Sequence, residues 1–126
     1  MVWLGVDHSP GNFESYLEYL SQSLVYFHGL VDSPMPRART EAQHCGCCVV
    51  TTPYHDAGEI WEDGKTGFLV NQDADSTDVA SLLISLISDC AAEARAIGEA
   101  GREMAAEKLG WSRYVEEWEH MLQKVL

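Results

Sequence analysis

Two arginines and a glutamate lie close together where the sequence predicts the start of a helix: Arg37, Arg39 and Glu41. They follow a predicted strand end at His28 and a loop that contains two prolines. A helix N-terminus exposes free backbone amides and a partial positive charge, so it can hold a phosphate, and arginines add fork-shaped donors. Because Glu41 lies one turn into the helix, its carboxylate could accept hydrogen bonds from two adjacent sugar hydroxyls. The pattern indicates a site for a phosphate and a sugar, with ordinary solvated helix charges as the alternative.

Histidines and cysteines offer two weaker candidates for chemistry. His28 and His55 follow predicted strands, where either could act as a general base or contact a phosphate, although a lone histidine is more often structural. Three of the four cysteines are crowded between His44 and Cys48, without the second pair of ligands that a zinc site needs. We therefore expect no metal, and we expect small buried thiols at a helix-to-strand turn, without disulfides.

The pattern of apolar residues predicts the elements that position these side chains. Short β-branched and aromatic runs predict strands at 2–6, 24–28, 47–52 and 67–70. Helical spacing of apolar residues predicts helices at 13–24, at 36–45, from Ser76 onward and at 92–108. We also expect a helical turn at 58–60 and a last helix that Ser112 caps.

Strands that alternate with helices predict an α/β fold. We expect a partial Rossmann-like domain of three layers, with a small, mostly parallel sheet and three C-terminal helices over 76–126. The length fits a single domain over residues 1–126. The ligand site of such a sheet lies beyond the carboxyl ends of its strands. The loops after Val6, His28 and Thr52 should therefore surround one crevice.

The helix that carries Glu41 also belongs to a longer sequence pattern. The segment around the second glutamate of glycosyltransferase family 4 and related retaining GT-B enzymes closely resembles the run Pro36-Arg37-Ala38-Arg39-Thr40-Glu41-Ala42-Gln43-His44-Cys45-Gly46-Cys47-Cys48-Val49-Val50. Further signatures follow in the family's order at Gly58-Glu59-Ile60, Asp63-Gly64-Lys65-Thr66-Gly67-Phe68-Leu69-Val70, Ile97-Gly98-Glu99-Ala100-Gly101-Arg102 and Trp111-Ser112-Arg113-Tyr114. The resemblance runs from about Leu24 to the end, and it implies the nucleotide-sugar-binding C-terminal half of a GT-B transferase.

The resemblance implies roles for the residues around the predicted helix start. The family's second glutamate binds the ribose of the nucleotide sugar, and it corresponds to Glu41. The amides around Pro36 to Arg39 would face the diphosphate, with the Arg37 and Arg39 side chains beside it. The nucleotide-diphosphate sugar is a substrate, so no cofactor is expected.

Two further parts of the donor site follow from the resemblance. Gly58 and Glu59 are similar to the family's loop beside the donor. The family's first glutamate, which contacts the transferred sugar, falls at Ser33, and Cys48 stands where the family has proline. The contact with the sugar is therefore the part of the family's pattern from which this chain departs.

The length of the chain limits what it can do alone. GT-B enzymes place the reaction between two Rossmann-like domains, which needs roughly 250 to 300 residues. We therefore expect the isolated chain to be inactive in hexosyl transfer, because it lacks the acceptor domain and the family's basic residues for the leaving diphosphate. Expected partners are a separate acceptor-domain chain or further copies, since Trp111 to Leu126 would leave an apolar face uncovered. The alternative is a non-catalytic oligomerisation or interaction module derived from a glycosyltransferase.

Composition disfavours two other classes of partner. With 20 acidic and 8 basic residues, the net charge is −12. Nucleic acid and anionic lipid are bound mostly by lysine and arginine, so neither is expected to bind. No apolar run reaches the roughly 18 residues of a membrane-spanning helix, and the start of the sequence does not have the pattern of a secretion signal. We expect a soluble, cytoplasmic protein.

Overall fold

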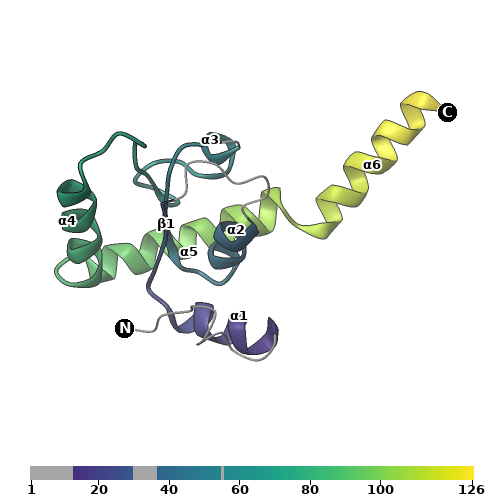
Figure 1. Ribbon diagram of the computed structural model, residues 1–126. Coiled ribbons are helices and arrows are strands. Elements are labelled where there is room, and N and C mark those ends of the chain that lie inside the picture. Colours follow the sequence, from purple (N-terminus) through teal and green to yellow (C-terminus); the bar gives the residue numbers. More distant parts are fainter. Residues whose placement is uncertain (1–12, 30–36, 55) are drawn as a thin grey trace.

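The computed structural model describes residues 13–29, 37–54 and 56–126. Helices and strands alternate as far as residue 69, and three helices follow in succession (Figure 1). In chain order they are α1 (Phe13–Gln22), β1 (Val25–His28), α2 (Arg37–His44), β2 (Cys48–Thr51), α3 (Ala57–Ile60), β3 (Phe68–Leu69), α4 (Ser76–Ile87), α5 (Ala91–Lys108) and α6 (Trp111–Val125). The predicted strand at 2–6 lies outside the described residues. The other predicted elements are present, with small differences at their ends, where assignments commonly vary.

The three strands form one sheet in the order β1-β2-β3. Val25 pairs with Cys48 and His28 with Thr51, and β2 continues the sheet by pairing with Phe68 and Leu69. Both pairings are parallel, so the carboxyl ends of the strands lie at the same edge. The predicted α/β class with a small, mostly parallel sheet is confirmed.

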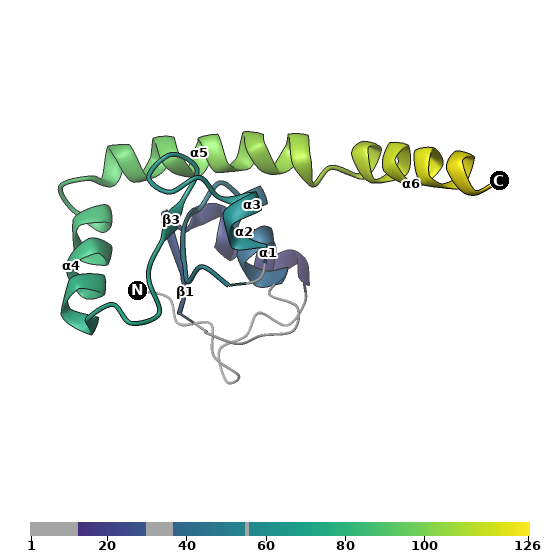
Figure 2. The same ribbon diagram turned by 90° about the horizontal axis from the view of Figure 1, so that it is seen from above.

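The central strand β2 is buried on both faces and separates two apolar clusters. On one face, Val49 packs with residues of α1, α2 and α3 and of the segment after α3; the buried ones are Leu20, Ala42, Ala57, Ile60 and Trp61. On the other face, Cys48 and Val50 pack against α4 and α5 through Leu86, Ala94 and Ile97. Successive strand residues face opposite sides, which explains the division. Figure 2 shows α4 on one side of the strands and α1, α2 and α3 on the other, as a three-layer fold requires.

Helix α5 packs closely on the turn from α2 into β2. A Cβ atom at Gly98 would lie 2.2 Å from the carbonyl oxygen of Gly46 and 2.9 Å from the amide nitrogen of Cys48. Gly46 itself ends α2 with a φ of 83°, a conformation that glycine adopts without steric cost. Cys47 and Cys48 are fully buried in this turn, as predicted for small thiols, and all four cysteines are free.

The last helix, α6, projects away from the rest of the molecule in both views (Figures 1 and 2). None of its residues is buried, and Trp111 is 76% exposed. The prediction that Ser112 caps this helix is wrong. The helix already begins at Trp111, so that Gly110 occupies the N-cap and Ser112 lies within the first turn. Among the described residues, no helix combines the length and apolar character needed to cross a membrane.

Candidate functional site

The carboxyl ends of β1 and β2 lie side by side, next to the first turns of α2. His28 ends β1 and pairs in register with Thr51 at the end of β2. The side chain of Arg39, from the first turn of α2, reaches the Thr51 hydroxyl at 3.3 Å. The ends of the two strands that precede these loops are therefore adjacent. The loop after Val6 lies outside the described residues, as do residues 30–36 after β1, with Ser33 and Pro36, and His55.

Glu41 lies one turn into α2 and is half-buried. It is near two tyrosines from the preceding elements, Tyr16 of α1 and Tyr26 of β1. Burial raises the pKa of Tyr16, and the negative charge of Glu41 and a hydrogen bond between the two side chains raise it further. The pKa of Tyr26 is raised by burial and then by Glu41. Among the described residues, Glu41 takes part in no ion pair, so no cation from this part of the chain neutralises its carboxylate.

The two arginines of the first turn of α2 have different surroundings. Arg37 is exposed, whereas Arg39 is fully buried. The Arg39 guanidinium forms an ion pair of 2.9 Å with Asp56, whose side chain is 55% exposed. It is therefore not a solvated surface charge. The guanidinium points into the protein, toward β2 and the segment before α3.

His28 is buried at the carboxyl edge of the sheet, between two tyrosines. Its Nε2 lies 2.7 Å from the Tyr54 hydroxyl, and its ring stacks with those of Tyr26 and Tyr54. Burial lowers the pKa of His28, and the positive charge of Arg39 lowers it further. The imidazole is therefore held mainly neutral at pH 7, in a hydrogen bond with a phenol. This arrangement fits the structural role that lone histidines more often have.

Gly58 and Glu59 lie on the exposed side of the short helix α3. A Cβ atom at Gly58 would meet nothing within 4 Å, so the backbone of α3 is open to the surroundings there. Glu59 and Asp56 line a hollow of about 300 Å³, which the end of α5 and the start of α6 close through Lys108, Leu109 and Arg113. The predicted donor loop therefore meets the junction of α5 and α6.

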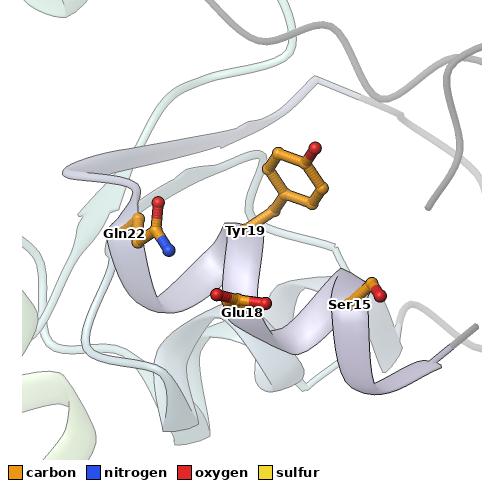
Figure 3. A pocket seen from close by; sticks show the side chains of 4 residues that line it. All are labelled: Ser15, Glu18, Tyr19 and Gln22. Carbon is orange, nitrogen blue, oxygen red and sulfur yellow. The ribbon is translucent and has the colours of Figure 1, made fainter.

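A second hollow, of about 360 Å³, lies on α1 and is a poorer candidate. Figure 3 shows its described lining, Ser15, Glu18, Tyr19 and Gln22, spaced along this one helix. The only charge in this set is the carboxylate of Glu18, which would repel a phosphate. Within the described ranges, no three His, Cys, Asp or Glu side chains are grouped so that they could hold a metal ion.

Sequence reasoning missed the partners of Glu41 and Arg39. Tyr26 could have been found, because it lies two positions before His28 in a strand and such residues share a face. Tyr16 belongs to the apolar stripe of the first helix, and its hydroxyl gave no separate signal. Asp56 lies in a loop, where no periodicity shows which way a side chain points.

Comparison with known proteins places this arrangement in a family. The family model described as "Glycosyl transferases group 1" matches residues 10–104. The chain belongs to the group 1 glycosyl transferases. This group 1 chain is similar to the alpha-maltose-1-phosphate synthase of Mycolicibacterium smegmatis, with 33% identity over 113 residues that cover 86% of the chain and 29% of the relative.

Solved structures show the same fold. Sucrose-phosphate synthase from Thermosynechococcus elongatus matches with a TM-score of 0.76 and 23% identity, over 87% of this chain and 27% of that one. HepE of Anabaena, solved in complex with UDP-glucose, matches with a TM-score of 0.70 and 20% identity, over 85% of this chain and 29% of that one. The expected GT-B glycosyltransferase membership is confirmed. The group 1 chain spans about 29% of the length of the curated relatives it matches.

Proposed function

We propose that this chain is the nucleotide-sugar donor-binding part of a hexosyl-transferring GT-B glycosyltransferase. The observation that carries the proposal is the position of Glu41. Its carboxylate is half-buried one turn into α2, the helix that follows β1, and no cation among the described residues neutralises it. Ligands of such folds bind beyond the carboxyl ends of the strands, where a helix of this kind begins. Tyr16 lies near the carboxylate and can occupy one of its acceptor sites, which leaves acceptor capacity for two ribose hydroxyls.

The diphosphate of the donor would lie at the N-terminus of α2. The free amides of the first helical turn and the macrodipole favour an anion there, and the exposed Arg37 adds a mobile positive charge. The buried Arg39 adds positive potential from within the protein, without direct contact through its ion-paired guanidinium. Ser33 would stand on the sugar side of this site, where the family has its first glutamate.

The loop of Gly58 and Glu59 would complete the donor site. The open backbone at Gly58 allows close approach of a ligand, and Glu59 stands beside it on the hollow that α5 and α6 close. HepE of Anabaena was solved with UDP-glucose, and this likeness supports a nucleotide sugar as the ligand class for the present chain.

Calorimetry with nucleotide sugars tests the proposal. The 126-residue chain is titrated with UDP-glucose, ADP-glucose and GDP-mannose, and then with the matching nucleoside diphosphates and glucose 1-phosphate. We expect at least one nucleotide sugar to bind at millimolar or lower concentration. Glucose 1-phosphate should bind more weakly, because it has no ribose for Glu41. Absence of binding by every nucleotide sugar at millimolar concentration would contradict the proposal.

For transfer, we propose that this domain works with an acceptor domain, on the same or a separate chain, and that alone it binds the donor without transferring the sugar. The exposed face of α6 fits such a partner. Its apolar side chains, all largely exposed, are Trp111, Tyr114, Trp118, Met121, Leu122 and Val125. A contiguous apolar face of this kind marks a contact surface.

The same face favours a second candidate, a non-catalytic module that assembles with its own copies. Light scattering, together with titration by nucleotide sugars, distinguishes the donor-binding domain from the self-assembling module. If α6 mediates self-association, the chain should scatter light as an oligomer, and Trp118→Glu should convert it to a monomer by placing a charge in the apolar contact. Glu116→Gln, on the opposite face of α6, is the matched control and should leave the oligomer intact. An oligomer that binds no nucleotide sugar would favour this second candidate, whereas a wild-type monomer, or an oligomer that binds a nucleotide sugar, would contradict it.

A further inference from the structure

The side chain of Arg39, in α2, contacts several residues of the later segment that runs from Thr51 to Trp61. Its guanidinium donates hydrogen bonds to the Thr51 hydroxyl at 3.3 Å, to the Tyr54 carbonyl at 3.4 Å and to the Asp56 carboxylate at 2.9 Å. The guanidinium carbon lies 4.5 Å from the centre of the Tyr54 ring and 4.9 Å from that of Trp61. One side chain from the first turn of α2 thus contacts the end of β2, the following loop and both ends of α3.

At Asp56, the ion pair with Arg39 takes the place of the usual N-cap hydrogen bond. It occupies the N-cap of α3, where an aspartate side chain usually accepts a hydrogen bond from an amide of the first turn. Here the side chain makes no capping hydrogen bond, and it pairs with Arg39 instead. The ion pair therefore joins α2 to the start of α3, in addition to the apolar contacts of Ala57 and Ile60 in the core.

Burying this arginine is costly for the fold. The side chain is fully buried, while its carboxylate partner is 55% exposed, and the Arg39 Nε has no hydrogen-bond partner among the described residues. A buried charge with such incomplete pairing costs desolvation that a well-packed apolar side chain would avoid. Stability alone therefore gives a weak reason for an arginine at this position.

We propose that Arg39 is a positioning residue for the donor site, one that holds the helix of Glu41 and the loop of Gly58 and Glu59 at a fixed separation. The inference rests on the proposed donor-binding function. A nucleotide sugar that contacts both elements binds well only if both are already in place, because ordering a loop on binding costs affinity. Arg39 supplies that order in the free protein, through its fork of donors and its two ring contacts.

Three variants separate positioning from stability. Arg39→Leu replaces the arginine with a shorter apolar side chain of similar volume, so we expect a thermal midpoint at or above that of the wild type. We expect its affinity for the nucleotide sugar that the wild type binds to fall about tenfold or more, because α3 is no longer fixed. Arg39→Lys keeps the charge without the fork and should recover part of the affinity. Arg95→Leu, an exposed arginine on α5, is the matched control and should bind the donor as the wild type does.

Amide hydrogen exchange in α3 gives a readout that needs no ligand. The amides of Glu59, Ile60 and Trp61 are hydrogen-bonded to carbonyls of this segment, and they should exchange faster in Arg39→Leu than in the wild type or in Arg95→Leu. If wild-type chain binds no nucleotide sugar, the donor-binding proposal fails, and the exchange rates still decide whether Arg39 holds α3.

Two results would overturn the inference. One is wild-type donor affinity in Arg39→Leu, and the other is unchanged exchange in α3 of that variant. If Arg39→Leu does not fold, Asp56→Asn takes its place, because the Asp56 side chain is half-exposed and its replacement leaves the core intact. We expect Asp56→Asn to weaken donor binding and to speed exchange in α3, and wild-type values for both would equally overturn the inference.

Discussion

Gly98→Val should lower the free energy of unfolding by about 3 kcal/mol or more, a large part of the roughly 5–15 kcal/mol that stabilises an ordinary domain. The reason is the close approach of α5 to the start of β2. A Cβ atom at Gly98 would lie 2.2 Å from the Gly46 carbonyl oxygen, and it would lie 2.9 and 3.0 Å from the Cys48 nitrogen and the Cys47 carbonyl carbon. Backbone atoms cannot move aside as a flexible side chain can, so α5 must shift away from the sheet.

Urea unfolding followed by circular dichroism measures this effect. Gly58→Ala is the matched control, because a Cβ atom there meets nothing within 4 Å and alanine favours a helix. It should leave the stability unchanged or raise it by about 1 kcal/mol at most. A Gly98→Val chain as stable as the wild type would mean that α5 does not lie against β2 as described.

Much of this fold could be predicted from the sequence because its elements have strong local signals. Val49 and Val50 lie in an apolar run between a glycine and a proline, and β2 is buried on both faces accordingly. The stripe of Leu82, Leu83 and Leu86 likewise predicts α4, and these residues do pack in the core. In α4 the helical period selects the side that is buried, whereas the continuous apolar run of β2 corresponds to burial on both faces.

The start of α6 differs from the predicted one for a physical reason. Ser112 is a residue type that favours N-caps, and the prediction relied on this local preference. The chain instead leaves α5 at Gly110, whose backbone is extended with φ −68° and ψ 147°, and the helix starts directly afterwards. A glycine is acceptable at the N-cap, so the cap preference of serine did not decide the boundary.

The candidate site was only half predictable. The position of Glu41 in the first turns of a helix after a strand indicated its chemistry, and the family resemblance implied its ligand. The burial of Arg39 could not be foreseen, because arginine is almost never fully buried without a partner and its partner Asp56 lies in a loop. Contacts between distant loops and helices leave no periodic trace in a sequence.

Glu41→Gln should weaken binding of the nucleotide-sugar donor about 10- to 100-fold, while the thermal midpoint changes little. The substitution keeps the size of the side chain and one acceptor oxygen, but it removes the negative charge and places an NH₂ group against one ribose hydroxyl. A hydrogen bond to a charged group contributes about 1.5–3 kcal/mol, and about 1.4 kcal/mol corresponds to a factor of ten in affinity. Isothermal titration calorimetry with the nucleotide sugar that the wild type binds gives the ratio of affinities. Glu103→Gln, which removes an exposed carboxylate from α5, is the control for the change in net charge.

Binding of a 2′-deoxy form of the same donor tests whether Glu41 contacts the ribose in particular. If the carboxylate accepts hydrogen bonds from the ribose hydroxyls, the wild type should lose affinity for the 2′-deoxy donor, and Glu41→Gln should lose much less on the same change. The effects of the two changes on the binding free energy are then not additive, because each change removes the same contact. Equal losses in the two proteins would place Glu41 away from the ribose. If Glu41→Gln bound the complete donor as tightly as the wild type does, the Glu41 carboxylate would not be a donor-binding group.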